Sequence, residues 1–395
     1  MLYKCKYVRT CDLMGMIMKA RRWLLCSVSF SLLLVTGCSS LTKPSPELPK
    51  TFDPCDSPNV PTLYVPKDRG SIAAAVMELG DHGRVVVAPS EYRENIKILA
   101  GRHVIIQAEG PEHPEIFPAD HDVPVVTVAP GARLCLNGLS LHGGQAGLVA
   151  GNADTGDAAG AVTMLDTRVA DAGYGVYGVV DQFHIERSSI ENNIYGLVLA
   201  GNASLFNVWI AENEFNMLLS GGSKPSCAAA AWSDTGSKVV VQNVTIMYGK
   251  QGGFAICNAA SATVKDVYVW KNGFVGAQIR NVNNFTFDDS RVGETRLWNG
   301  GWGDGLQVVH SNGIVKDSQF SANKRANIIY YGKSGGTIDN NLIVYGVFSI
   351  ALEGLDGSSP NPVITPGNYM YGNKENRVTY GKTITPIPSP SVPPP

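Results

Sequence analysis

One stretch of the chain concentrates the side chains that could carry out chemistry. Between Arg291 and Lys333, acidic, basic and aromatic residues are unusually dense: Glu294, Arg296, Trp298, Trp302, Asp304, His310, Lys324, Arg325, Tyr330 and Tyr331. Proton abstraction next to the carboxylate of a uronic acid needs a cation to neutralise the carboxylate, a base to take the proton and an acid for a leaving oxygen. The stretch therefore contains the residue types that β-elimination or epimerisation of a uronate would require.

Each of these roles has candidates in the stretch. Arg325 and Arg296 are the candidate cations. Lys324 and His310 are the candidate bases, and Tyr330 is the candidate proton donor and a candidate sugar contact. The set is hypothetical until a fold brings these side chains together.

Two further features of the stretch favour a sugar site. If Gly305 and Ala326 occupy equivalent positions in successive repeats, Asp304 lies one repeat below Arg325, at a strand spacing of about 4.8 Å, and the two side chains can touch. An insertion in the stretch would project over the same face and offer flat rings for stacking on sugars. Its two aromatic residues are Trp298 and Trp302.

A structural explanation of the same residues stays open. Asp304 and Arg325 would then be a surface ion pair, His310 an ordinary turn residue, and the tryptophans a structural plug. A further candidate, His121, lies between two aspartates in a polar run that is more typical of an exposed turn. Acidic side chains are available for calcium, but no run has the ligand spacing that would assign a metal site, so the cofactor stays unknown.

These residues need a scaffold, and a repeat in the chain predicts one. Short apolar runs alternate with polar turns, and a polar residue recurs at the same phase: Asp166, Arg187, Asn207, Asn243, Asp266, Asp289, Asp317 and Asn340. The spacing is 20–23 residues except across two insertions, near 221–236 and 293–302. A second marker opens the next apolar run and keeps step with the first: Gly175, Gly196, Gly276, Gly305 and Gly346.

A repeat of this length suits three short strands that pair in parallel with their equivalents above and below. Alternate residues then point into a narrow apolar core, and no single turn buries its inner side without its neighbours. The recurring Asn and Asp residues should form a ladder at one corner, where short polar side chains tolerate left-handed backbone. The predicted fold is an all-β solenoid, a parallel β-helix, whose corner acids are structural.

A short helix should cover the first turn of this solenoid, because an open sheet end invites aggregation. Ser71 can cap a helix that continues to Leu79. Four apolar residues of that segment fall on one helical face: Ile72, Ala75, Val76 and Leu79.

The segment after the predicted helix resembles the first coil of the pectin lyase-like superfamily. Gly83 to Asn95 contains V-V-V-A-P-S-E-Y-R-E, close to the superfamily phrase V-V-V-A-P-G-x-Y-x-E, with Ser90 in the glycine position. With the repeat, the resemblance covers about Leu63 to Asn376. It implies a right-handed, single-stranded parallel β-helix with a short N-terminal capping helix.

Many members of that superfamily are lyases, hydrolases, esterases or epimerases of acidic polysaccharides, but the resemblance says little about activity. The Gln-Asp-Thr and Leu-Gly-Arg-Pro-Trp segments expected of a pectin methylesterase are missing from the sequence. Of the motifs expected of a polygalacturonase, only a faint echo remains, Asp304-Gly305-Leu306. Neither activity carries over.

The first 37 residues resemble an export signal. A basic segment, 19–22, precedes an apolar run, 23–35, that is too short to span about 30 Å of hydrocarbon comfortably. Leu34 to Cys38 resembles the bacterial lipobox, which implies that Cys38 carries acyl chains such as palmitate and becomes the new N-terminus. Ser39 then implies anchoring at the outer membrane, either facing the periplasm or exposed at the surface.

Composition divides the remainder of the chain. Residues 38–61 are rich in Pro, Ser and Thr and are predicted to be a tether. Residues 62–376 carry the repeat and form the β-helix domain, and residues 377–395 are predicted to be a Pro-rich tail.

Four cysteines follow the lipobox: Cys55, Cys135, Cys227 and Cys257. An even count in an oxidising compartment permits disulfides without fixing their pairing, and Cys227 with Cys257 is the best candidate. The formal net charge is −2, with no long basic run outside the leader, which argues against nucleic acid as a partner. A monomer is expected.

The combined interpretation is a cell-envelope lipoprotein whose β-helix binds acidic polysaccharide, with lyase or epimerase activity as the enzymatic form of the hypothesis. The alternative is a non-catalytic surface or scaffold lipoprotein that contacts another envelope component. An enzyme should bring four residues into one groove, whereas a scaffold should scatter them: Arg296, Asp304, Lys324 and Arg325.

Overall fold

The computed structural model describes residues 59–227, 236–297, 302–354 and 357–380, together with residues 55 and 57. The predicted export signal and lipidation residue Cys38, most of the predicted tether, Trp298 and the chain beyond residue 380 lie outside the described residues. Within the described part of the chain, no helix has both the length and the apolar character needed to cross a membrane.

One short helix, α1 (Ile72–Glu78), lies at the beginning of the described chain. The hydroxyl of Ser71 accepts a hydrogen bond from the backbone N–H of Ala74 at 3.1 Å, and the carboxylate of Glu94 accepts two more N–H groups of the first turn. These bonds satisfy donors that a helix start leaves free. Three apolar residues of the helix are buried, Ile72, Ala75 and Val76. The predicted capping helix is confirmed.

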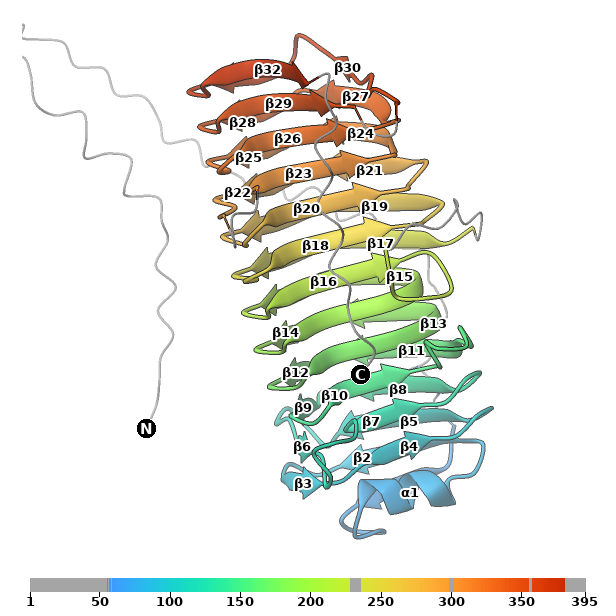
Figure 1. Cartoon of the computed structure of the whole chain (residues 1–395). Coiled ribbons are helices and arrows are strands. Elements are labelled where there is room, and N and C mark those ends of the chain that lie inside the picture. Colours follow the sequence, from blue (N-terminus) through green and yellow to red (C-terminus); the bar gives the residue numbers. More distant parts are fainter. Residues whose placement is uncertain are drawn as a thin grey trace, which may run out of the picture. The chain divides into compact units, whose positions relative to one another are not determined.

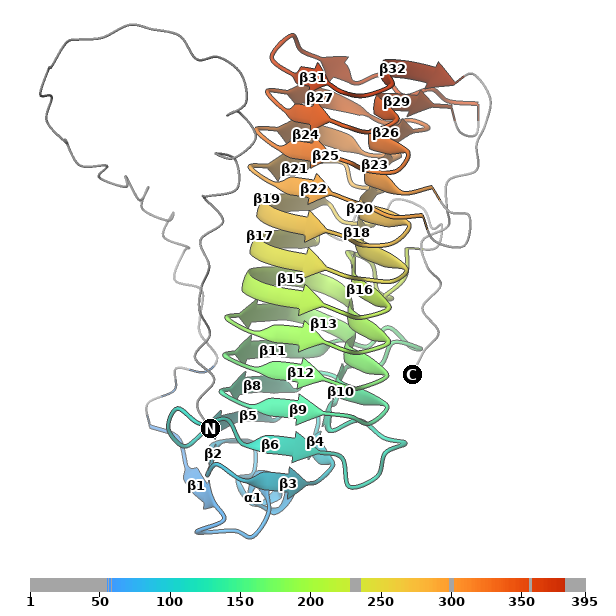
Figure 2. The same ribbon diagram turned by 90° about the vertical axis from the view of Figure 1, so that its left-hand side faces the viewer.

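The other described elements are strands that wind into one coil with three sides, and every pairing between successive turns is parallel (Figures 1 and 2). The first sheet contains β4 (Ile96–Ile98), β7 (Val126–Val128), β10 (Ala146–Ala150), the start of β13 (Tyr174–Glu186) and of β15 (Tyr195–Ala211), β16 (Phe215–Ser220), β18 (Gly252–Cys257), β20 (Val275–Arg280), β23 (Asp304–Val309), β26 (Ala326–Tyr331), β29 (Phe348–Glu353) and β32 (Glu375–Tyr380). The second contains β1 (Thr62–Val65), β2 (His82–Val87), β5 (His103–Ala108), β8 (Arg133–Asn137), β11 (Ala159–Leu165), later parts of β13 and β15, the start of β17 (Lys238–Met247) and of β19 (Ser261–Trp270), β21 (Phe285–Asp288), β24 (Asn312–Lys316), β27 (Gly335–Asp339) and β30 (Val363–Ile364). The third contains β3 (Glu91–Arg93), β6 (Glu115–Phe117), β9 (Ser140–His142), β12 (Arg168–Ala170), β14 (Ser189–Glu191), the ends of β15, β17 and β19, β22 (Arg291–Gly293), β25 (Gln319–Ser321), β28 (Leu342–Val344) and β31 (Tyr369–Tyr371).

The inner sides of the three sheets enclose one continuous apolar core. In the first sheet, one inward column is fully buried and runs through five turns: Phe254, Ala277, Leu306, Ile328 and Ile350. Each turn covers the apolar residues of the next, so burial of apolar surface stabilises the stack and not the single turn.

The predicted corner ladder is confirmed. All eight residues assigned to it have left-handed backbone, with φ between 46° and 55°. The residues just before four of them are paired from turn to turn: Lys265, Asp288, Lys316 and Asp339. The side chain of Asn340 donates to Asp317 at 2.6 Å, so neighbouring rungs bond one another. These carboxylates and amides hold the corner between the second and third sheets.

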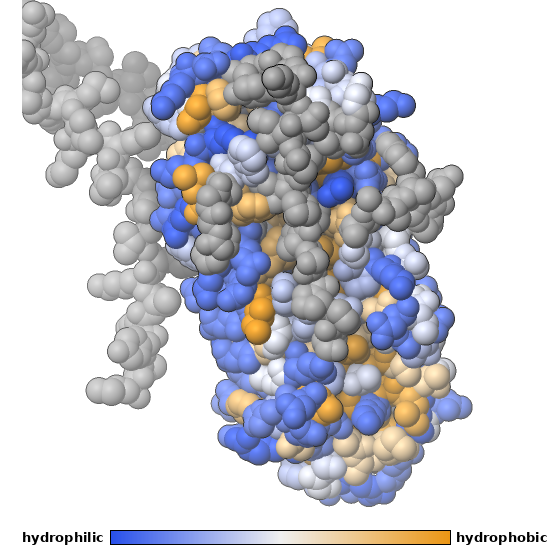
Figure 3. All heavy atoms as spheres, in the orientation of Figure 1, coloured by the Kyte–Doolittle hydropathy of each residue, from blue (hydrophilic) through white to orange (hydrophobic). Residues whose placement is uncertain are grey.

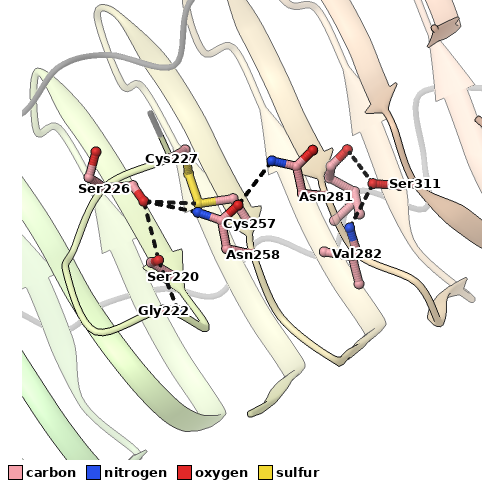
Figure 4. The surroundings of a disulfide bond; sticks show 10 residues. Ser220, Gly222, Ser226, Cys227, Cys257, Asn258, Asn281, Val282 and Ser311 are labelled. Carbon is pink, nitrogen blue, oxygen red and sulfur yellow. Dashed lines mark hydrogen bonds between the residues drawn. A yellow bond between two sulfur atoms is a disulfide. The ribbon is translucent and has the colours of Figure 1, made fainter. Parts of the chain in front are cut away.

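Among the described residues two disulfides are present, Cys55–Cys135 and Cys227–Cys257. The second confirms the predicted pair and ties the segment after β16 to the end of β18 (Figure 4). The carbonyl of Ser226 adds two hydrogen bonds to this attachment, from the Ser220 hydroxyl and the Asn258 amide, each at 3.2 Å. The start of the first predicted insertion is thus fixed to the outside of the first sheet.

We expect a variant with serine at both Cys55 and Cys135 to lose about 2–4 kcal/mol of unfolding free energy. This disulfide spans a sequence separation of 80, so it restricts a long loop of the unfolded chain. Urea unfolding followed by circular dichroism measures the loss. Serine at Cys227 and Cys257, separated by 30 residues, is the matched comparison and should cost less; a larger loss there would contradict the loop-length argument.

Candidate functional site

A group of polar side chains lies on the outer side of the first sheet. Its residues come from β20, β23, β26 and β29 or from the segment just before β26, on successive turns of the coil (Figure 1). We call it the polar cluster, and it consists of Gln278, Arg280, Asp304, Gln307, Arg325, Tyr331 and Glu353. Strand pairing places Gln278 beside Gln307 and Tyr331 beside Glu353. Because neighbouring strands lie about 4.8 Å apart, residues from four turns meet in one region.

An ion pair between Asp304 and Arg325 forms the centre of the polar cluster. The Nε of Arg325 donates to Oδ1 of Asp304 at 2.7 Å, and its Nη2 donates to Oδ2. The carboxylate also accepts from the Gln307 amide at 2.8 Å and from the backbone N–H of Ala326 at 3.3 Å. Asp304 is fully buried, and the side chain of Arg325 is 12% exposed. The contact predicted between these two residues is therefore confirmed, as a bidentate and nearly desolvated pair.

The register that brings them together differs from the expected one. Leu306 lies opposite Ile328, so these two turns are offset by 22 residues and not by the 21 that pairing Gly305 with Ala326 assumed. The long side chain of Arg325 reaches Asp304 in spite of this difference.

Arg325 has two further partners on the same side of the sheet. Its guanidinium lies 4.1 Å from the centre of the Trp302 ring, and its Nη2 donates to the hydroxyl of Tyr331. Burial alone would lower the pKa of Arg325, but the hydrogen bond and the charge of Asp304 raise it above its usual value. Burial also raises the pKa of Tyr331, with Asp304 adding to the effect. The arginine therefore stays charged and the tyrosine stays a neutral donor.

Glu353 is the second acid of the polar cluster. Its Oε1 lies 3.8 Å from Nη1 of Arg325, and its buried Oε2 has no hydrogen-bond partner among the described residues. Burial raises the pKa of Glu353, Arg325 opposes the shift and Asp304 adds to it, and together they bring the pKa to about 7. A carboxyl group with this pKa can accept or release a proton near neutral pH.

Arg280 is a cation without a counter-charge. Among the described residues it forms no ion pair, and its buried Nε has no hydrogen-bond partner. Burial lowers its pKa, although an arginine remains charged. On the same strand, the amide of Gln278 donates to Gln307 at 2.8 Å, and Gln307 continues to Asp304. Arg280 is thus an uncompensated positive charge on β20, at one end of the polar cluster.

Comparison with known proteins gives the fold. A family model described as a right handed beta helix region matches residues 173–343. The chain is a right-handed parallel β-helix. The A-module of mannuronan C-5 epimerase AlgE4 from Azotobacter vinelandii superposes with a TM-score of 0.59 at 16% identity, over 80% of this chain and 94% of that one. The AlgE6 A-module of the same organism gives 0.53 at 14% identity, over 80% and 93%.

A Dettilon tailspike protein is a third similar structure, with a TM-score of 0.53 at 12% identity, over 80% of this chain and 68% of that one. The sequence has no significant match among curated proteins. At these identities the solved structures establish a shared fold. The expected right-handed parallel β-helix is confirmed, while activity has to be argued from the side chains of this chain.

The β-helix corrects one predicted site residue. Tyr330 points into the core, where it is fully buried and packs among apolar residues, and its hydroxyl has no partner among the described residues. It can therefore neither stack on a sugar nor donate to one. Its neighbour Tyr331 lies on the outer side of the sheet, where its ring is also fully buried and its hydroxyl accepts a hydrogen bond from Arg325.

The other predicted residues are spread around Asp304. His310 is a corner residue at the far end of β23, six residues from Asp304, or about 20 Å along an extended strand. Its Nδ1 accepts a hydrogen bond from the backbone N–H of Lys333. Lys324 and Arg296 are exposed at the opposite corner. Of the four residues expected to converge, the structure brings only Asp304 and Arg325 into contact.

The β-helix also contains a hollow of different character. A cleft of about 370 Å³ beside β7 and β10 is lined mainly by apolar groups, among them Val128, Pro130 and Val149. Figure 3 shows hydrophobic residues in this lower part of the molecule. A site for an acidic ligand needs cations and hydrogen-bond donors, so the polar cluster is the better candidate. Within the described chain, no three His, Cys, Asp or Glu side chains gather as metal ligands would.

We expect the Glu353→Gln variant to change how stability depends on pH. A carboxyl whose pKa rises from 4.5 to about 7 on folding holds its proton more tightly in the folded protein. Its contribution to stability is therefore present below pH 4.5 and is lost as the pH rises through 7. Relative to the variant, the wild type should lose roughly 1–3 kcal/mol across this interval. Thermal unfolding at a series of pH values measures it; parallel curves would contradict the shift.

Proposed function

We propose that the β-helix binds an acidic, uronate-containing polysaccharide along the outer side of its first sheet, at the polar cluster. The observation that carries the proposal is Arg280, an arginine with no counter-charge among the described residues, next to a connected row of amide and carboxylate groups. A carboxylate of the polymer would supply the missing charge through a hydrogen-bonded ion pair.

The arrangement favours Arg280 over Arg325 as the group that binds the sugar carboxylate. Two donors of Arg325 already bond Asp304, so its charge is used inside the protein. Arg280 has no such partner. Arg325 then acts as a positioning residue, because it holds the hydroxyl of Tyr331 and lies beside Glu353.

We further propose that the bound uronate undergoes epimerisation or β-elimination. Glu353, whose pKa lies near neutral pH, would take the C5 proton of one uronate, and the electron pair left on C5 would delocalise into the carboxylate on that carbon. The strand register places Glu353 three turns, or about 14 Å, from Arg280, so Arg280 would hold the carboxylate of another sugar of the same polymer. Return of a proton to the opposite side of C5 gives the epimer. Loss of the oxygen at C4, which takes up a proton as it leaves, gives a C4–C5 double bond instead. The structural similarity to mannuronan C-5 epimerase modules agrees with the first outcome and establishes the fold alone.

The predicted location forms part of the proposal. The lipobox-like segment that ends at Cys38 would attach the chain to the outer membrane, and the Pro-rich residues that follow would hold the β-helix away from the lipid surface. Metabolic labelling with a palmitate analogue, compared between the wild type and a Cys38→Ala variant, tests this part by itself.

The full chain, incubated with a panel of uronic acid polymers, tests the function. Elimination produces unsaturated ends that absorb in the ultraviolet, and epimerisation changes the anomeric signals in the NMR spectrum of the polymer. Binding without either product would leave a polysaccharide-binding protein. No binding to any polymer would overturn the proposal and favour the scaffold alternative.

A further inference from the structure

A second group of side chains stands out on the third sheet, on a different side of the coil from the polar cluster. Four aromatic residues lie at its outer surface, and we call them the aromatic platform: Trp209, Tyr248, Tyr268 and Trp270. Trp209 is 43% exposed and Tyr248 is 40% exposed. Figure 2 looks onto this sheet, with β12 below and β22 above the turns concerned. These large rings lie outside the core, so core packing does not explain why they are there.

Two of the four rings lie in one column along the axis of the coil. Trp209 lies opposite Thr245, Thr245 opposite Tyr268, and Tyr268 opposite Arg291, one turn apart each time. Trp209 and Tyr268 are therefore two turns apart, or about 10 Å. Trp270 stacks beside Tyr268, with ring centres 5.4 Å apart and an angle of 13° between the ring planes. Trp209 and Tyr268 thus lie in one column along the axis, and Trp270 lies beside Tyr268 on the same strand.

The Trp270 ring packs against the backbone of Gly293. These residues are paired on adjacent turns, and a Cβ atom at position 293 would lie 2.1 Å from Cζ3 of the indole. The ring therefore lies flat against the backbone of Gly293, in space that any other residue would fill. A ring seated in this way is ordered before a ligand arrives, so binding costs less conformational entropy.

Polar groups frame the rings. Thr245 lies between Trp209 and Tyr268, and Arg291, beside Tyr268, is exposed and forms no ion pair among the described residues. Nearby, Lys271 pairs with Glu294 at 3.8 Å. In a protein–protein interface, the apolar side chains would be expected to form one contiguous patch. Here rings alternate with hydrogen-bonding side chains, the pattern that suits the apolar faces and hydroxyl edges of sugar rings.

We infer that the aromatic platform is a second carbohydrate-binding surface, which holds an acidic polysaccharide chain along the axis of the coil. The chain stacks on Trp209 and Tyr268, Trp270 widens the stacking surface beside Tyr268, and Arg291 faces a carboxylate. The inference does not depend on the polar cluster, because the two surfaces lie on different sheets. A chain held here would keep the β-helix on its polymer whether or not the polar cluster is occupied, since two linked sites bind with avidity.

The test is retention of the full chain on an immobilised uronic acid polymer. Replacing Trp209 and Trp270 together by alanine should weaken retention at least ten-fold, and Arg291→Ala should reduce its dependence on salt. Tyr64→Ala, an equally exposed aromatic on the second sheet, is the matched control and should bind as the wild type does. Gly293→Ala displaces the Trp270 ring without removing it and should give an intermediate loss.

Unchanged retention of the double variant would overturn the inference. So would a change confined to self-association in sedimentation, because the platform would then be an interface between copies. Quenching of tryptophan fluorescence by the soluble polymer in the wild type, lost in the double variant, would support the inference even if the melting temperature of the variant were lowered. An Arg280→Ala variant with platform binding intact separates this surface from the polar cluster.

Discussion

The Arg325→Ala variant is expected to lose about 3–5 kcal/mol of unfolding free energy. The reason is the charge that remains. Asp304 is fully buried, and without the guanidinium it keeps only the Gln307 amide and the backbone N–H of Ala326 as donors. A buried carboxylate without a counter-charge lowers the unfolding free energy by far more than the intact ion pair contributes to it. Urea unfolding at pH 7 measures the loss, and the variant should recover part of its stability at low pH.

A double variant separates lost charge from lost packing. With Asp304→Asn and Arg325→Met together, no buried charge remains, and the asparagine keeps acceptor and donor groups for Gln307 and Ala326. The double variant should be more stable than Arg325→Ala by at least about 1 kcal/mol. If both proteins are equally unstable, the packing of Arg325 under Trp302 matters more than its charge.

The corner of the β-helix was predictable because its residue types report backbone conformation directly. Asn and Asp tolerate positive φ, so their recurrence marked the corner that the structure shows with left-handed backbone at all eight positions. The same logic also missed a corner. Between the third and first sheets, positive φ falls on Asp171 and Asn192 in two turns, but on Glu212, Tyr248 and Lys271 in the next three, so residue type does not mark that corner consistently.

The candidate site was harder to predict because it depends on register at the level of one residue. In a strand, a shift by one position exchanges the inner and outer sides. That sensitivity explains why Tyr330 was assigned to the surface when its neighbour Tyr331 is the outward residue. The Asp304–Arg325 contact survived a one-residue error because an arginine is long enough to bridge it.

The density of charged and aromatic residues along the sequence does not single out Arg280 and Glu353. Both lie outside the stretch from Arg291 to Lys333, on the turns below and above it. In the structure they share one outward column with Tyr331. Aligning the turns by their corner residues and reading down that column would have placed all three together, which is the information that a linear scan discards.

Replacement of Arg280 by alanine is expected to weaken binding of a uronic acid polymer by roughly 10–100-fold. A hydrogen-bonded ion pair with a carboxylate contributes about 1.5–3 kcal/mol, and each 1.4 kcal/mol is a factor of ten. The folded protein should be little affected, because Arg280 has no ion-pair partner to leave behind among the described residues. This separates it from Arg325, whose removal disturbs binding and folding together. Equilibrium binding to a defined oligosaccharide, at two salt concentrations, measures the effect.

Arg133→Ala supplies the control, since Arg133 is an exposed arginine on β8 of the second sheet and the variant makes the same change in net charge. If both variants weaken binding equally, the polymer is held by general electrostatic attraction and not by a site. A different result would identify the sugar carboxylate as the group recognised. In that result only Arg280→Ala weakens binding, and the wild type binds a neutral polysaccharide as weakly as Arg280→Ala binds the acidic polymer. Arg280→Lys refines the result: a lysine keeps the charge but loses the planar fork, so partial recovery would indicate a bidentate contact.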